Sequence, residues 1–262
     1  METYPMPDRV IYITSRDGHK LKAHLYEPAT ARTALAVVIN LHGSGYVLRL
    51  HGESDEFCRK LRDEAQVSVY DVTYRLAPEY PFPAAYNDAE DVLEHVVKAH
   101  PNVPIVVSGF SAGGTLALCV SSNGPLELRD KSYLSLSGQV ERVTEDGADQ
   151  VLLVKKDPRF SYSTNEQQLE AMPDTVVVLT AGLDLIAPEA EAFADKLRQT
   201  RTRASVGGGG GGAAGAAART VVVKRFTGVQ HAFDIQLSSD RDVEAKDEAY
   251  GMAVGVVKGL VQ

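Results

Sequence analysis

The stretch Ile105-Val106-Val107-Ser108-Gly109-Phe110-Ser111-Ala112-Gly113-Gly114 decides the fold of this chain. Its apolar beginning is typical of a buried strand, and residues 115–120 after it are typical of a helix. Gly109 and Gly113 flank Ser111 in a Gly-x-Ser-x-Gly pattern, which suits a sharp strand-to-helix turn where a Cβ at either glycine would clash. The backbone N–H groups of the helix then favour negative charge beside the serine. An ordinary glycine-rich turn has the same local pattern, so the motif alone does not identify a catalytic serine. That interpretation requires partner residues for Ser111 elsewhere in the chain.

The composition is that of a soluble globular protein. The 262 residues are 44% hydrophobic and 24% charged, and this length suits one large α/β domain or two small ones with a substantial core. The net charge of -8 argues against nucleic acid or an anionic membrane as a partner. No apolar run reaches the length of a membrane span and the N-terminal residues lack signal-peptide features, so we expect a cytoplasmic protein. Cys58 and Cys119 fit buried free thiols, and we expect no metal site and no cofactor.

Strand-like and helix-like segments alternate along the chain. A β-hairpin is expected over residues 10–26. Strands are expected over residues 34–41, 67–74, 105–109, 175–180 and 220–226, those at 34–41 and 175–180 buried, with amphipathic helices between them. This alternation predicts a mostly parallel central sheet with helices on both faces. We expect one domain over residues 1–262, with a short, reduced lid and one sheet strand within 123–173. The Gly/Ala-rich segment 204–219 is expected to be a flexible loop.

A catalytic serine needs a base within hydrogen-bond reach and an acid that orients the base. Of the seven histidines, His231 alone follows Ser111 in the sequence, and it comes directly after the last predicted strand. Asp184 follows the preceding strand, so the chain order is Ser, Asp, His. Two rival acids are less well placed, because Asp174 precedes its strand and Glu189 belongs to a helix. We therefore predict a Ser111-Asp184-His231 triad, and the alternative for Asp184 is an ordinary turn or helix-capping role.

The negative oxygen that forms when a serine attacks a carbonyl needs preorganised hydrogen-bond donors. The sequence His42-Gly43-Ser44-Gly45 follows a predicted central strand, and its glycines let backbone N–H groups turn toward Ser111. We predict that the backbone N–H groups of Gly43, Ser44 and Ala112 form this oxyanion hole. His42 is expected to hydrogen-bond within its own loop.

Several motifs follow one another in order along the chain. They are residues 42–45 (His-Gly-Ser-Gly), 74–79 (Tyr-Arg-Leu-Ala-Pro-Glu), 81–85 (Pro-Phe-Pro-Ala-Ala), 109–114 (Gly-Phe-Ser-Ala-Gly-Gly), 157–159 (Asp-Pro-Arg), 181–184 (Ala-Gly-Leu-Asp) and 231–233 (His-Ala-Phe). Together they resemble the hormone-sensitive-lipase family of carboxylesterases over roughly residues 36–235. The resemblance implies an α/β-hydrolase fold with a helical lid, and cofactor-free hydrolysis of short- to medium-chain esters. It also implies that Arg75 and Glu79 brace the sheet.

The chain departs from the family pattern at three places. Ser44 replaces the middle glycine of the usual His-Gly-Gly-Gly, which leaves the backbone donor in place. Phe110 stands where relatives often have Asp, Gly or His. The amino-terminal lid region is short, and residues 123–156 lack the clear apolar strand of the family. The sequence therefore does not define the acyl pocket.

The predicted function is hydrolysis of a small-molecule ester by Ser111, through an acyl-enzyme. An amidase, lactonase or deacetylase of the same fold is an alternative, because pocket shape rather than the nucleophile selects the attacked group. A second alternative is a non-catalytic small-molecule binding protein on the same scaffold, and the presence of His231 favours the enzyme. The sequence indicates neither the physiological substrate nor the oligomeric state.

Overall fold

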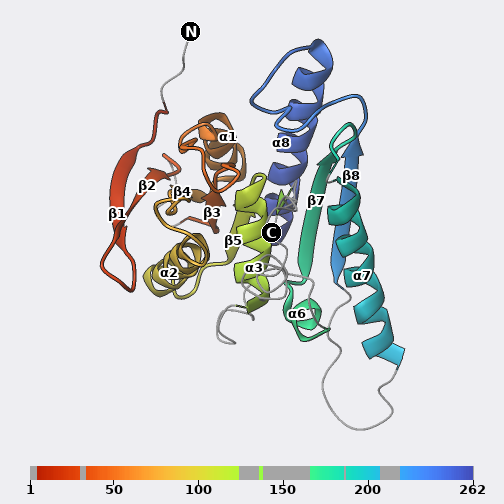
Figure 1. The fold of residues 1–262 in the computed structure, drawn as a ribbon, viewed down its shortest axis with the longest axis horizontal. Helices are drawn as coiled ribbons and strands as arrows, with labels where there is room; N and C mark the ends of the chain where they lie inside the picture. Colours follow the sequence, from red (N-terminus) through yellow and green to blue (C-terminus); the bar gives the residue numbers. More distant parts are fainter. Residues whose placement is uncertain are drawn as a thin grey trace.

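A computed structural model describes residues 5–29, 34–123, 136–137, 166–185, 187–206 and 219–261. The first half of the chain contains β1 (Arg9–Thr14), β2 (Lys20–Tyr26), β3 (Val37–Leu41), α1 (Asp55–Ala65), β4 (Ser68–Val72), α2 (Ala84–Ala99), β5 (Ile105–Gly109) and α3 (Ala112–Asn123). The second half contains β6 (Leu136–Ser137), α6 (Glu166–Ala171), β7 (Thr175–Ala181), α7 (Ala187–Val206), β8 (Thr220–Phe226) and α8 (Asp240–Val261). Figure 1 shows their arrangement. The expected hairpin and the five expected strands are all present.

The strands form a five-stranded sheet of order β1-β2-β4-β3-β5 and a three-stranded sheet of order β6-β7-β8. The ladders among β3, β4 and β5 and among β6, β7 and β8 are parallel, and the β1–β2 and β2–β4 ladders are antiparallel. Every residue of β3, β4 and β5 is buried, because helices cover both faces, and this accounts for their largely apolar sequences. The predicted fold class is confirmed.

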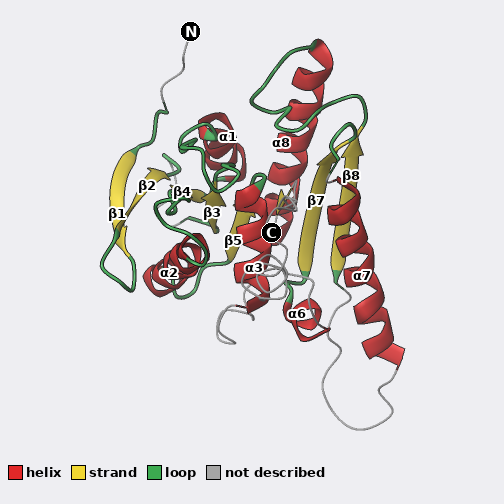
Figure 2. Cartoon of the chain, in the orientation of Figure 1, coloured by secondary structure: helices red, strands yellow, loops and turns green. Residues whose placement is uncertain are grey.

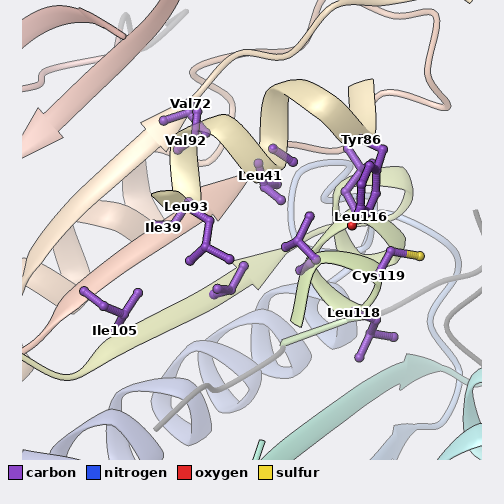
Figure 3. Packing of buried hydrophobic residues seen from close by; sticks show 14 of the residues in the cluster. Ile39, Leu41, Val72, Tyr86, Val92, Leu93, Ile105, Leu116, Leu118 and Cys119 are labelled. Atoms are coloured by element: carbon purple, nitrogen blue, oxygen red, sulfur yellow. The ribbon is translucent and has the colours of Figure 1, made fainter. Parts of the chain in front are cut away.

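The two faces of the first sheet pack against different helices (Figure 2). On one face, Ile39 and Leu41 contact side chains of α2 and α3, including Leu93 and Leu116 (Figure 3). On the other face, Val38 belongs to a second core cluster that contains residues of α1 and α8. The alternation of side chains along β3 thus divides its residues between two helix layers.

The structure revises where the predicted 204–219 loop begins. The rest of this loop and most of the predicted lid lie outside the described residues. Residues 204–206 continue α7, so the predicted loop begins later than residue 204. The helix can run on because the helix-breaking glycine run begins only at Gly207. The rest of that segment, 207–218, and most of the predicted lid, including residues 157–159, lie outside the described residues. Within 123–173 the structure describes the short strand β6, which pairs with β7, and the helix α6.

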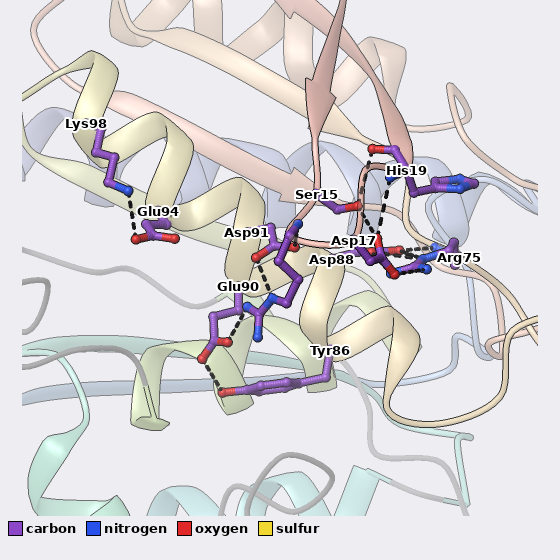
Figure 4. Close-up of polar contacts among 11 residues, drawn as sticks. Ser15, Asp17, His19, Arg75, Tyr86, Asp88, Glu90, Asp91, Glu94 and Lys98 are labelled. Carbon is purple, nitrogen blue, oxygen red and sulfur yellow. Dashed lines mark hydrogen bonds and ion pairs between the residues drawn. The ribbon is translucent and has the colours of Figure 1, made fainter.

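Arg75 ties the β1–β2 hairpin to α2, as the resemblance implied (Figure 4). Its guanidinium lies 2.7 Å from the carboxylate of Asp88, which is fully buried on α2, and 2.6 Å from the carboxylate of Asp17 in the hairpin turn. Glu79 does not take part, because its side chain is 61% exposed and its ion pair among the described residues is with Arg49, at 3.9 Å. The brace expected from two residues therefore belongs to Arg75.

None of the described helices combines the length and hydropathy needed to cross a bilayer.

Candidate active site

Ser111 lies at the turn between β5 and α3. Its φ of 53° is in the left-handed region, which a residue other than glycine adopts only where the surroundings enforce it. The turn is tight, since a Cβ on Gly113 would lie 2.1 Å from the carbonyl oxygen of Leu41 and one on Gly109 would lie 2.3 Å from the carbonyl oxygen of Gly113. The two glycines thus permit the close approach of α3 to β3 that exposes Ser111 at the end of the sheet.

Ser111, His231 and Asp184 come together from three loops that follow β5, β8 and β7. Ser111 Oγ lies 3.3 Å from His231 Nε2, and His231 Nδ1 lies 3.2 Å from Asp184 Oδ2. Backbone hydrogen bonds join the last two loops, because the N–H of Gly182 donates to Phe226 and that of Leu183 donates to Val229. The parallel pairing of β7 with β8 therefore holds acid and base at a fixed separation.

The surroundings of His231 keep its imidazole neutral near pH 7. Partial burial lowers the pKa of His231, and the negative charge of Asp184 opposes that effect. The Asp184 side chain is 8% exposed, whereas that of His231 is 44% exposed and so remains accessible to substrate. With Nδ1–H donating to Asp184, the lone pair of Nε2 faces the Ser111 hydroxyl and can accept its proton.

The turn after β3 lies directly against Ser111. A Cβ on Gly43 would be 3.4 Å from the Cβ of Ser111, and both Gly43 and Ser44 line the same cavity as the serine. Ala112, the third residue predicted to donate to an oxyanion, is buried at the first position of α3, so the group that it can offer is its backbone N–H. The structure thus brings the predicted donor residues to the nucleophile.

Tyr74, which the sequence did not single out for this role, anchors the turn. The Tyr74 hydroxyl donates its hydrogen to the carbonyl oxygen of His42, at 2.7 Å. Because that hydrogen is used, the Ser44 hydroxyl is the donor in its own bond to the Tyr74 oxygen, also 2.7 Å long. Ser44 Oγ in turn accepts the N–H of Tyr46 at 2.9 Å. This chain of bonds gives Ser44, which replaces the usual glycine, a side-chain function within the loop. Only the tertiary structure reveals it, because Tyr74 comes from the end of another strand.

His42 hydrogen-bonds within its loop, as predicted. Its Nδ1 lies 2.8 Å from the carbonyl oxygen of Gly43, and its ring stacks on Tyr74 with 4.5 Å between centroids. Burial lowers the pKa of His42 to about 4, so the ring is neutral and Nδ1–H donates the bond. His42 therefore supports the shape of the turn, and His231 is the imidazole that contacts Ser111.

A cavity of about 270 Å³ opens beside Ser111. Apolar side chains form most of its wall, and they are Leu48, Leu50, Phe57, Phe110, Leu179, Phe233, Ile235 and Ala253. Phe110 packs edge-on against Phe57 of α1 at 5.1 Å, and Tyr250 of α8 packs against Phe57 at the same distance. In the sequence, Phe57 is indistinguishable from an ordinary core residue, because only the approach of α1 to α8 makes it a cavity wall.

Comparison with known protein sequences supports this assignment of the fold. A family model described as "alpha/beta hydrolase fold" matches residues 38–149. An ethyl acetate hydrolase from Pseudomonas putida is 38% identical over 117 residues, which cover 42% of this chain and 37% of that protein. A versiconal hemiacetal acetate esterase from Aspergillus parasiticus is 34% identical over 114 residues, which cover 44% of this chain and 36% of that protein. The matches span little more than a third of the length of these curated relatives.

Solved structures extend the similarity to nearly the whole chain. EstE1, a thermostable carboxylesterase cloned from a metagenomic library, superimposes with a TM-score of 0.74 at 25% identity, over 99% of this chain and 91% of that one. An esterase from Pyrobaculum calidifontis superimposes with a TM-score of 0.67 at 25% identity, over 98% and 86% of the two chains.

Proposed function

From the alpha/beta hydrolase fold of this chain, we propose that it is a serine carboxylesterase that hydrolyses short- to medium-chain esters. The observation that carries the proposal is the contact of Ser111 Oγ with His231 Nε2 at 3.3 Å, backed by Asp184 at 3.2 Å from the other ring nitrogen. The similarity to an ethyl acetate hydrolase and to EstE1 supports the same reaction class. The cavity of about 270 Å³ beside the serine suits a small ester.

In the proposed mechanism, Ser111 Oγ attacks the ester carbonyl while His231 Nε2 takes its proton. Asp184 holds His231 with Nδ1 protonated, and the N–H groups of Gly43, Ser44 and Ala112 donate to the oxyanion. The tetrahedral intermediate collapses as His231 returns the proton to the departing alcohol, which leaves an acyl group on Ser111. Water then attacks this acyl-enzyme by the same proton transfers and releases the carboxylic acid.

Hydrolysis of a series of p-nitrophenyl esters from acetate to dodecanoate tests the proposal. We expect activity to be highest on short chains and kcat to fall by about 10⁴- to 10⁶-fold in Ser111→Ala. Ser122→Ala is the matched control, because that hydroxyl is buried on α3 and donates to Cys119, away from the cavity. A fluorophosphonate probe read by mass spectrometry should label Ser111 in the wild type and in Ser122→Ala.

Three outcomes would contradict the proposal. One is wild-type turnover by Ser111→Ala, which would remove the nucleophile from the mechanism. Another is tight binding of an intact small molecule without turnover by the folded wild type, which would favour a binding protein. A third is turnover confined to anilides or lactones, which would favour an amidase or lactonase with the same site.

The proposed partner is a small-molecule ester, and the net charge of -8 makes nucleic acid an unfavourable partner. The proposal includes no cofactor. The single-domain organisation and the cytoplasmic location expected from the sequence stay predictions, which limited proteolysis and cell fractionation test.

A further inference from the structure

A row of buried polar side chains crosses the first sheet on the face that α1 and α8 cover. The strand register pairs His24 of β2 with Asp71 of β4, Asp71 with Asn40 of β3, and Asn40 with Ser108 of β5. Residues paired in this way point to the same face of a sheet. All four are at most 3% exposed, so each polar atom in the row needs a partner from the protein or from a ligand.

Hydrogen bonds satisfy only one end of this row. Ser108 Oγ donates to Asn40 Oδ1 at 2.9 Å, and Asn40 Nδ2 donates to Asp71 Oδ1 at 2.8 Å. The chain of bonds stops there, because among the described residues neither Asp71 Oδ2 nor His24 Nδ1, both buried, has a hydrogen-bond partner. The electrostatic contacts of the Asp71 carboxylate are with His51 and with the backbone N–H of Gly52. A buried carboxylate oxygen without a hydrogen bond is costly, and one cation between Asp71 and His24 would satisfy both atoms.

A third side chain, His51, reaches the same point from the loop between β3 and α1. Its Nε2 lies 3.4 Å from Asp71 Oδ2 and 3.0 Å from the Asp71 carbonyl oxygen, and its ring lies 4.1 Å from that of His24. One ligand atom from each of His24, His51 and Asp71 can be chosen so that all three lie within 4.8 Å of one another.

From this juxtaposition we infer that His24, His51 and Asp71 form a binding site for one divalent transition-metal ion of the zinc type. Two imidazoles and a carboxylate are a ligand set that Zn²⁺ accepts, with water as a fourth ligand. Metal–ligand bonds of about 2.0–2.2 Å place tetrahedral ligand atoms about 3.3–3.6 Å apart. Because the three atoms lie within 4.8 Å of one another, side-chain movements that shorten these separations by about 1 Å would complete the site. On metal binding, His51 Nε2 would give up its hydrogen bond to the Asp71 carbonyl oxygen and bind the ion instead.

The surroundings of the three residues fit this assignment. The bond from Asn40, itself fixed by Ser108, orients the Asp71 carboxylate so that Oδ2 points away from Asn40, as an outer-shell partner does at a metal site. An entry path exists, because the His51 side chain is 11% exposed and lines a second cavity of about 280 Å³. None of the three ligands lines the cavity at Ser111, so the ion would stabilise the loop that follows the oxyanion turn and would not take part in hydrolysis.

Metal titration of the untagged full chain tests the site. After removal of metals with EDTA and dialysis, we expect one Zn²⁺ per chain by isothermal titration calorimetry. The melting temperature should rise by at least about 4 °C at a hundredfold excess over Kd. Co²⁺ in place of Zn²⁺ should give the visible absorption of a tetrahedral nitrogen–oxygen site.

Two single variants locate the ion. His51→Gln and Asp71→Asn should each weaken Zn²⁺ binding by at least about 100-fold, because even outer-shell changes cost 10- to 100-fold. His95→Gln is the control, since it removes an exposed imidazole from α2 and should leave the affinity unchanged. An unchanged melting temperature with Zn²⁺ would overturn the inference in favour of a metal-free His51–Asp71 pair. Undiminished binding by both variants would overturn it in favour of another location.

Discussion

Ser111 Oγ and His231 Nε2 lie 3.3 Å apart, although 120 positions separate the two residues in the chain. Ser111 follows the carboxyl end of β5 in the five-stranded sheet, and His231 follows the carboxyl end of β8 in the three-stranded sheet. The contact is therefore a consequence of topology, and the chemistry of the site depends on how the loops after these strands hold the two groups.

The pH profile of the proposed reaction reports on His231. Burial lowers the pKa of His231 below its ordinary 6.5, and the base must be neutral, so kcat/KM should rise with pH through a midpoint below 6.5. Asp184→Asn removes the charge that raises this pKa, so the midpoint should move to lower pH. The same variant should lower kcat by about 10⁴-fold, because an amide favours the wrong tautomer. Asp174→Asn, at the rival acid before β7, should change neither quantity. A midpoint that moves to higher pH in Asp184→Asn would contradict this account.

Tyr74 should act as a positioning residue for the oxyanion turn. Tyr74→Phe deprives the His42 carbonyl oxygen and the Ser44 hydroxyl of their shared partner. We expect kcat to fall by about 10-fold with KM nearly unchanged, because loosened donors cost less than the 10²- to 10³-fold of a deleted one. Steady-state kinetics on a p-nitrophenyl ester measure both constants.

Tyr70→Phe is the matched control for this experiment. It also removes the hydroxyl of a buried tyrosine with a histidine partner, His100 at 2.9 Å, but that pair lies outside the cavity. Equal losses of kcat in Tyr70→Phe and Tyr74→Phe would show that the effect is general destabilisation.

An added methyl group at Gly113 should lower the stability of the protein, whereas one at Gly251 should raise it. A Cβ on Gly113 would lie 2.1 Å from the carbonyl oxygen of Leu41, which is backbone and cannot move aside, so Gly113→Ala should abolish soluble folded protein or lower stability by more than about 3 kcal/mol. Gly251 lies within α8 with no atom within 4 Å of an added Cβ. Gly251→Ala should therefore raise the free energy of unfolding by about 0.5–1 kcal/mol. Urea denaturation compares the two, and a stable Gly113→Ala protein would contradict the tight turn.

The Arg75–Asp88 ion pair should matter for stability because it is buried. Arg75→Met leaves the fully buried Asp88 carboxylate without its main partner and should cost about 3–5 kcal/mol. Lys98→Met breaks an exposed pair with Glu94 on the same helix and should cost less than about 0.5 kcal/mol. If Asp88→Asn in the Arg75→Met background recovers no stability, the unpaired charge is not the cause. Chemical denaturation of the four proteins gives these differences.

Much of the fold and of the candidate site is predictable from the sequence because the signals are local. The apolar runs of β3, β4 and β5 and the helical stripe of α2 match the structure closely. The chain order predicts that Ser111, Asp184 and His231 lie on loops after the carboxyl ends of strands, and the structure brings those side chains together. The helix end at Val206 differs from prediction because a helix can extend up to the first glycine that breaks it.

By itself, the sequence determined the strand and helix periodicities, the glycines of the Ser111 turn and the chain order of the proposed triad. These features depend on residues close together in the chain or on their order. Only the tertiary structure decided that Phe57 and Tyr250 form a cavity wall, that Tyr74 holds the oxyanion turn, and that His24, Asp71 and His51 share one buried point. Strand register and the packing of α1 against α8 determine these contacts, and both depend on which distant segments pack together.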